Sequence, residues 1–339
     1  MTAPTVVRRS GPVAFLGALV LFPFVFGQHW LVNIAIFVVM YAAVSTSWNL
    51  LGGLTGYLSL GHAAFFGLGA YAIGVTFSRT GIGDGYRPFL ALPLVGIGVA
   101  IAAAPVGWIA LRVRAATFAI VTITLLFVVQ RLAFNVRSLT GGSQGLTLPA
   151  PSFPSDTYER PYYLAMLAVY AISVATCWFV IRSRLGLVLA TIRDDEDRAR
   201  GLGIRVTEAK VIAFATSAGL AAMAGGVWGY YIGFIYPQFA VDPLVTIGAV
   251  LMAFLGGKGR LWGPTLGALI LVPAQQYLAF EYGASQLYLI GYAAVFLVIM
   301  LVLPRGILPS ARDRLDQRGE RRRIAAARHD SGAASGVTP

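Results

Sequence analysis

Charged side chains gather in one segment of this chain, Arg182–Lys210, which reads RSRLGLVLATIRDDEDRARGLGIRVTEAK. Twelve of its 29 residues are charged, seven basic and five acidic, and the sequence on either side is apolar. A cation site at Asp194–Asp197 is not expected, because four consecutive acids on a helix spread over about 300° and do not converge on one ion. The segment reads either as a docking surface for a soluble partner or as a solvated loop.

A second group of polar residues lies in the glycine-rich stretch Trp48–Ala72, WNLLGGLTGYLSLGHAAFFGLGAYA. Six glycines there favour close helix packing or a broken helix within a membrane. A broken helix would let polar groups line a solute pathway, whereas the alternative is a packing interface in which His62 is satisfied by a neighbouring carbonyl. The pathway candidates in this stretch are Thr55, Tyr57, Ser59, Gly61 and His62.

A third stretch, Thr117–Leu148, adds polar residues to an otherwise apolar segment. Gln130 is a further pathway candidate. For Thr122 and Thr124 the favoured interpretation is a hydrogen bond from each hydroxyl back to its own helix.

Several kinds of chemistry are excluded by what the sequence lacks. There is no G-x-x-x-x-G-K-[ST] loop for ATP and no H-E-x-x-H motif. Three histidines and one cysteine form no metal-binding pattern and allow no intramolecular disulfide. We therefore expect no catalytic residues, no metal and no cofactor bound by this chain. The net charge of +12 does not indicate nucleic acid, because the basic residues lie at the ends of apolar segments and in the C-terminal tail.

The elements that must position these residues are membrane helices. Of the 339 residues, 57% are hydrophobic and 12% are charged, and the apolar runs approach the roughly 20 residues that a helix needs to cross a bilayer. The sequence predicts an all-α, polytopic membrane helix bundle of about ten spans, at 12–26, 30–50, 57–77, 88–111, 116–131, 161–181, 211–232, 243–255, 264–280 and 286–303. Five spans in each half would make the halves inverted copies, although no internal sequence repeat is evident.

Charge sets the predicted orientation. With ten spans and a cytoplasmic N-terminus, 21 of the 26 basic residues fall on the cytoplasmic side, as the positive-inside rule requires. The predicted organisation is a cytoplasmic N-terminus (1–11), a transmembrane domain (12–303) with a cytoplasmic loop at 182–210, and a basic cytoplasmic tail (304–339). That tail is expected to be mostly disordered or a short helix at the lipid surface.

Three stretches together carry a family resemblance: the glycine-rich stretch, TFAIVTITLLFVVQRLAFNVRSLTGGSQGL at 117–146, and ATIRDDEDRARGLGIRVTEAKVIAFATSAGLAAMAGG at 190–226. With FLGGKGRLWGPTLGALIL at 254–271 and PRGIL at 304–308, they resemble the LivM-type permeases of branched-chain amino acid ABC importers. The resemblance covers most of residues 30–309. Two departures are Tyr57, where a glutamine is frequent in that family, and the less typical stretch 238–242.

The resemblance implies a permease in the bacterial inner membrane that works with a second, LivH-like permease and a solute-binding protein outside the cell. Two ATP-binding subunits, which hold ATP and magnesium, would dock on the cytoplasmic loops. Residues 191–200 would then form one short coupling helix that Gly201 and Gly203 end. The candidate coupling residues are Arg193, Asp194, Asp195, Glu196, Arg198, Arg200 and Gly203.

Alternatives remain for the solute and for the class of protein. A branched-chain amino acid, another small amino acid, urea or a short amide would each suit such a permease. An autonomous secondary transporter would need carboxylates within the membrane for ion coupling, but all 14 acids lie in loops, at span ends or in the tail. A scaffold without transport would have ordinary leucine-rich spans, unlike the glycine-rich stretch.

Overall fold

The fold of the chain is known from a computed structural model, which describes residues 7–80, 85–282, 294, 297–298 and 306–307. Helices make up most of it, and the one sheet among the described residues joins two strands of two residues each. The long helices are α1 (Val7–Val25), α2 (His29–Trp48), α3 (His62–Thr80), α4 (Arg87–Ala110), α5 (Ala115–Asn135), α7 (Glu159–Arg182), α10 (Val206–Ile232), α12 (Pro243–Gly256) and α13 (Gly263–Tyr282). The shorter elements are η1 (Asn49–Gly53), α6 (Arg137–Thr140), η2 (Gly142–Gln144), β1 (Leu146–Thr147), η3 (Ser155–Thr157), α8 (Arg184–Asp194), α9 (Glu196–Gly201), β2 (Phe234–Ile235) and α11 (Pro237–Ala240).

The predicted fold class, an all-α membrane helix bundle, is confirmed. Among the described residues, six helical segments are long and apolar enough to cross a membrane, judged by length and composition. Each of the first nine predicted spans has a helix at its place, although the third begins at His62 rather than Tyr57. The tenth predicted span (286–303) and the tail (304–339) lie almost entirely outside the described residues, so ten spans and inverted halves stay predictions. The six segments are residues 29–53, 87–110, 115–135, 155–182, 206–232 and 237–256.

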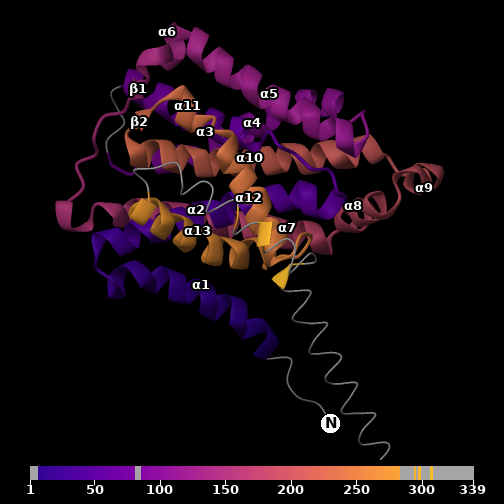
Figure 1. Cartoon of the computed structure of the whole chain (residues 1–339), viewed down its shortest axis with the longest axis horizontal. Helices are drawn as coiled ribbons and strands as arrows, with labels where there is room; N and C mark the ends of the chain where they lie inside the picture. The colour runs from indigo at the N-terminus through magenta and orange to yellow at the C-terminus, as the bar shows by residue number, and fades with distance from the viewer. Residues whose placement is uncertain (1–6, 81–84, 283–293, 295–296, 299–305, 308–339) are drawn as a thin grey trace, which may run out of the picture.

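Helix α10 is the centre of the bundle. It packs along α3 and α4 on one side and contacts α2 and α7 on the other (Figure 1). Its middle is rich in alanine and glycine, and Gly225 and Gly226 are buried there. Small residues let two helix backbones approach closely where lipid offers no hydrophobic drive for association. The backbones of α3 and α10 come close at Gly69, which faces Ala222, and at Gly225, which faces Phe66.

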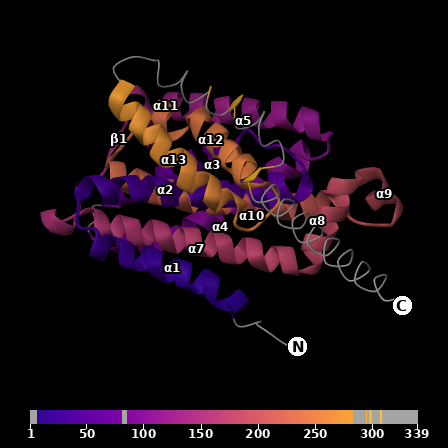
Figure 2. The ribbon, with the colours of Figure 1, turned by 60° about the horizontal axis from the view of Figure 1, so that its bottom comes forward.

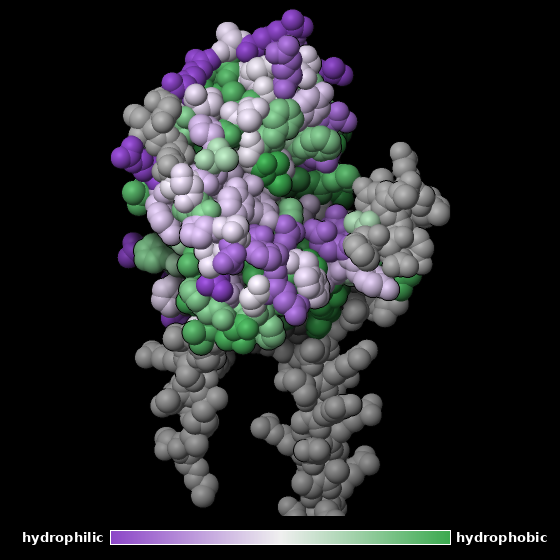
Figure 3. All heavy atoms as spheres, turned by 90° about the vertical axis from the view of Figure 1, so that its left-hand side faces the viewer, coloured by the Kyte–Doolittle hydropathy of each residue, from purple (hydrophilic) through white to green (hydrophobic). Residues whose placement is uncertain are grey.

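The two ends of the bundle carry different elements. Figures 1 and 2 show the long helices side by side, with α8 and α9 extending from one end. At the opposite end β1 pairs antiparallel with β2, Leu146 opposite Ile235. Seen from that second end, hydrophilic side chains gather at the edge over α6 and the adjoining end of α5 (Figure 3). The charged segment 182–210 and the loop after α5 thus lie at opposite ends, as the predicted span count requires.

We predict that Gly225→Ala will destabilise the bundle. A Cβ at this position would overlap the backbone carbonyl of Phe66 in α3, and overpacking of a tight core costs about 1–3 kcal/mol. Thermal unfolding of the detergent-purified protein, followed by tryptophan fluorescence, should show a lower midpoint. Gly98→Ala is the matched control, because a Cβ at Gly98 meets nothing within 4 Å; equal midpoints for the two variants would contradict the packing argument.

Candidate functional site

The glycine-rich stretch contains a break in the helical path. The helix that begins with α2 runs through η1, and Gly56 then takes a left-handed conformation with φ of +78°. Such a residue ends a helix, and glycine adopts it without steric cost. Residues 56–61 are not helical, and α3 starts at His62. The broken helix considered from the sequence is therefore present in the structure.

The polar candidates in the break are buried and bonded within the protein. Thr55 Oγ1 donates to Leu51 O at 2.7 Å, and Ser59 O accepts from Trp48 Nε1 at 2.8 Å. His62 Nδ1 lies 2.9 Å from Ser59 Oγ, and its Nε2 lies 3.2 Å from Ser217 Oγ in α10. The partners of His62 are thus two hydroxyls rather than the carbonyl expected. The arrangement fits the packing alternative for these three side chains.

Helix α5 borders the break through Thr122. Its Oγ1 bonds back to Phe118 O at 3.0 Å, as predicted, and also accepts from Leu60 N at 3.0 Å. A Cβ added to Gly61 would come 2.5 Å from Thr122 O, so Gly61 marks a close backbone approach. Gln130 lies two turns further along α5, where its amide donates to Val241 O at 3.0 Å. The structure does not bring Gln130 together with the other pathway candidates.

Tyr57 points away from those buried residues and toward α9. Its hydroxyl donates to Glu196 Oε2 and accepts from Lys210 Nζ at 2.9 Å. Lys210 Nζ also donates to Glu196 Oε1 at 3.0 Å, and Arg200 Nη2 donates to the same oxygen at 2.6 Å. We call Tyr57, Glu196, Arg200 and Lys210 the Lys210 cluster. It joins the break, α9 and the base of α10.

The charge state of Glu196 follows from the Lys210 cluster. Partial burial disfavours its carboxylate, but the hydrogen bonds from Tyr57 and Lys210 and the charges of Lys210 and Arg200 outweigh that effect and lower its pKa. Because the pKa is lowered in the folded state, these contacts stabilise the fold at neutral pH. That stabilisation is lost as the pH falls through the pKa of the folded state. Sequence reasoning counted Lys210 only as one basic residue of the charged segment, since nothing in its local pattern shows that it is buried.

The coupling candidates do not form the single helix expected over residues 191–200. Instead α8 ends at Asp194 and α9 starts at Glu196, with Asp195 extended between them. Asp195 is the N-cap of α9, because its carboxylate accepts from Arg198 N at 3.0 Å. Gly203, with φ of +78°, lies just beyond α9 as predicted, whereas Gly201 is the last residue of that helix. Asp194 and Arg198 are strongly exposed, at 76% and 85%.

A second connection ties this end of the bundle together. Asn49 of η1 is fully buried; its Oδ1 accepts from Gly259 N at 2.7 Å and its Nδ2 donates to Arg260 O at 3.1 Å. Arg193 at the end of α8 donates to Gly53 O at 3.4 Å. The turn after α12, the π-helical turn η1 and the end of α8 are therefore held to one another by side chain to backbone hydrogen bonds.

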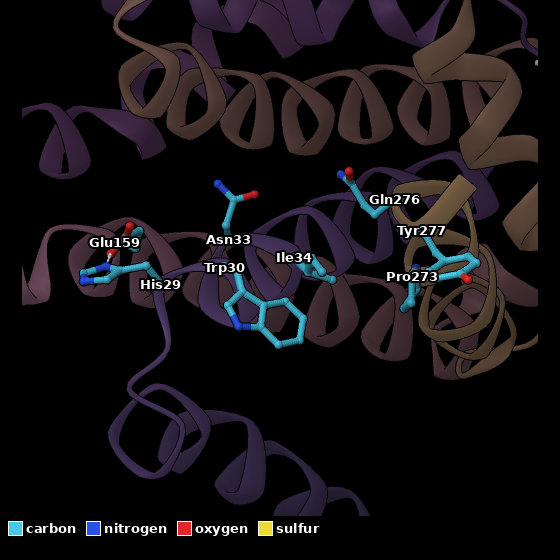
Figure 4. A pocket seen from close by; sticks show the side chains of 8 residues that line it. All are labelled: His29, Trp30, Asn33, Ile34, Glu159, Pro273, Gln276 and Tyr277. Atoms are coloured by element: carbon cyan, nitrogen blue, oxygen red, sulfur yellow. Dashed lines mark hydrogen bonds and ion pairs between the residues drawn. The ribbon is translucent and has the colours of Figure 1, made fainter. Parts of the chain in front are cut away.

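A cavity of about 800 Å³ lies between α2, the start of α7 and α13. Figure 4 shows His29 and Glu159 paired at one edge, where His29 Nδ1 and Glu159 Oε2 are 2.9 Å apart, and Gln276 near the other. Asn33 also borders it, but its amide is bonded to Tyr231 Oη. None of the pathway candidates lines this cavity. Within the described ranges no group of three His, Cys, Asp or Glu could hold a metal ion.

Residues 30–304 match the family model described as branched-chain amino acid transport system, permease component. The chain belongs to this family. Curated relatives agree. The branched-chain amino acid permease LivM of Salmonella typhimurium is 28% identical over 92% of this chain and 77% of its own. LivH of Escherichia coli is 26% identical over 79% of this chain and 91% of its own. A probable LivM of Methanocaldococcus jannaschii is 24% identical over 84% of this chain and 91% of its own. No solved structure matches the chain.

We predict that Asn49→Ala will loosen the turn that follows α12 of this permease. Losing the Asn49 carbonyl leaves the Gly259 N–H without its acceptor, at a cost of about 1 kcal/mol, which should speed its amide exchange about fivefold. Hydrogen exchange measured by mass spectrometry over residues 257–262 tests this. Asn135→Ala is the control, because that side chain bonds only within its own helix, to Arg131 O. Unchanged exchange at Gly259 would show that the tie is not needed.

Proposed function

We propose that this chain is a membrane-spanning permease subunit of an ABC importer that moves branched-chain or other small amino acids into the cytoplasm. ATP hydrolysis on two partner subunits, which hold ATP and magnesium, drives the transport, and this chain binds no cofactor itself. The observation that carries the proposal is the attachment of an exposed, charged helix pair, α8 and α9, to a helix break inside a member of this permease family. Urea or a short amide is the alternative solute.

The geometry at α8 and α9 supports docking of the ATP-binding subunits there. Exposed charges suit a surface that must be soluble before assembly and polar within the complex. The proposed docking residues are Arg193, Asp194, Asp195, Arg198 and Arg200, with Glu196 facing inward and Gly203 ending the surface. Glu196 is hydrogen-bonded to Tyr57, and Arg193 is hydrogen-bonded to Gly53 O. A displacement of this surface would therefore move the residues of the break.

Further parts of the proposal follow from the relatives. This chain matches both LivM and LivH permeases, so we propose a LivH-like second permease beside it and a solute-binding protein outside the cell. The segment that carries α8 and α9 faces the cytoplasm of a bacterial inner membrane, and both termini lie on that side. The solute pathway candidates are Thr55, Tyr57, Ser59, Gly61, His62 and Gln130, of which Gly61 sits at the closest backbone approach.

The decisive experiment is purification of the tagged permease in mild detergent, followed by mass spectrometry and reconstitution into liposomes. We expect a second permease and two ATP-binding subunits to copurify and ATP-dependent uptake of labelled leucine, with labelled urea as the alternative solute. If the chain purifies alone at every salt concentration and moves solute without ATP, it is an autonomous carrier and the proposal is wrong.

Replacement of Asp194–Asp197 by alanines is predicted to uncouple ATP hydrolysis from uptake. The change removes the N-cap of α9, the acidic part of the docking surface and the Glu196 carboxylate that reaches Tyr57. The variant should reach the membrane in normal amount while leucine uptake falls by at least about tenfold, the effect of losing about 1.4 kcal/mol of coupling. Glu208→Ala, an exposed acid beside the same surface, serves as control. Normal uptake by the alanine variant would exclude the docking role.

Gly61→Leu is predicted to block transport by pushing the break away from α5. Even a Cβ there comes 2.5 Å from the Thr122 carbonyl, and a leucine adds three more carbons to a contact with no room, at a cost of about 1–3 kcal/mol. Uptake should fall about tenfold or more while size-exclusion chromatography shows an assembled complex. Gly17→Leu tests the effect of an added side chain in open space. A fully active Gly61→Leu would mean that this approach is incidental.

A further inference from the structure

Lys210 lies in the second turn of α10 with no exposed side-chain surface. Its ammonium group donates to Tyr57 Oη at 2.9 Å and to Glu196 Oε1 at 3.0 Å, and it lies 4.1 Å from the centroid of the Tyr57 ring. A charge without contact with water is costly unless it is paired and hydrogen-bonded. Its position is therefore set by those two partners, one on each of two other elements.

The partners of Lys210 belong to two different segments. Glu196 is the first residue of α9, a helix of six residues whose one buried side chain is Ala199. Tyr57 is the second residue of the non-helical stretch 56–61. Lys210 belongs to α10, which packs along α3 and α4 through the bundle. One ammonium group thus joins the proposed docking surface to the break and to the central helix.

The other charged contacts of α9 are of a different kind. Arg198 pairs with Asp195 at 3.0 Å, with side chains 85% and 42% exposed, and exposed pairs of this type contribute little because water and salt screen them. Arg200 bonds to Glu196 at 2.6 Å but stays within α9. Of the pairs that α9 makes in the described part of the chain, the bonds of Glu196 to Lys210 and to Tyr57 are those that leave the segment and end at a buried group.

Tyr57 has a second acceptor within reach. Its hydroxyl lies 3.4 Å from Val113 O, just before α5, while it donates to Glu196. If the carboxylate is drawn away with α9, the hydroxyl can turn to this carbonyl and remain hydrogen-bonded. Both orientations of the hydroxyl are then hydrogen-bonded, so that it is not left unpaired in a low-dielectric site when α9 moves.

We propose that Lys210 is a coupling residue: with Glu196 and Tyr57 it transmits displacement of α9 to the helix break and to α10 during transport. The inference rests on the proposed function and adds the route by which motion enters the bundle. It assigns Lys210 to transmission, as a positioning residue that acts through Glu196. For Tyr57, whose hydroxyl is bonded to Glu196 and Lys210, this role takes the place of its candidacy for the solute pathway.

The test uses the reconstituted complex with its ATP-binding subunits and binding protein, and measures leucine uptake and ATP hydrolysis in the same liposomes. Lys210→Met/Glu196→Gln removes both charges together, so neither is left buried without a partner. We expect normal assembly and basal hydrolysis, while uptake per ATP falls about tenfold because the charge-assisted bonds from Lys210 to Glu196 of α9 and to Tyr57 of the break are gone. Arg205→Gln, which breaks an exposed pair at the start of α10, should keep the wild-type ratio.

Tyr57→Phe is the second variant, because it keeps the ring and the Lys210–Glu196 pair and removes only the hydroxyl. Uptake per ATP should fall about threefold or more, as expected for one buried hydrogen bond. A wild-type ratio in Tyr57→Phe, or in an assembled double variant, overturns the coupling role of Lys210 while leaving the importer assignment intact. If the wild-type complex shows no ATP-driven uptake, the importer assignment and the coupling role are both overturned, so the two failures are distinguishable.

Discussion

The close approach of α3 to α10 is the constraint on which the rest of this structure depends. Gly69 and Gly225 each face a backbone carbonyl of the other helix, at Ala222 and Phe66. Because the two backbones approach closely at these positions, α3 is fixed against α10 in the centre of the bundle. The break that precedes α3 then lies between α5, α9 and the N-terminal end of α10. Packing in the middle of the bundle thus determines which residues meet at its end.

The end of the bundle that carries α8 and α9 combines a rigid interior with an exposed surface. Asn49 and Arg193 tie η1 to the turn after α12 and to the end of α8, while the outer side of α8 and α9 is charged and exposed. The polar contacts of a surface that binds another subunit can vary. The groups that transmit a displacement of that surface to the interior of the bundle must be buried. Lys210 is buried and Glu196 is partly buried, whereas the arginines of α8 and α9 are exposed.

Much of the architecture could be predicted from the sequence. The lengths of the apolar runs predict the helices, since each of the first nine predicted spans coincides with one. The glycine content indicated a break only as one of two alternatives. The interior contacts could not be predicted in the same way. Gly61, Ala64, Gly67 and Ala70 have the spacing of a packing stripe, yet Gly69, which lies outside that spacing, faces the backbone of α10 at Ala222. The split between α8 and α9 depends on a single N-cap at Asp195, which a run of four acids conceals. Lys210 looks like a basic residue at a span end until its partners, 14 and 153 residues away in sequence, are seen.

The contact between α3 and α10 also limits how this protein can change over evolutionary time. In an ordinary core, a larger side chain on one element can be balanced by a smaller one on its neighbour, so that pairs of positions drift together. At Gly69 and Gly225 the opposing atoms are main-chain oxygens and carbons, which no substitution can make smaller. These two positions have no partner able to compensate, and they should stay glycine in every functional descendant of the chain, each independently of the other.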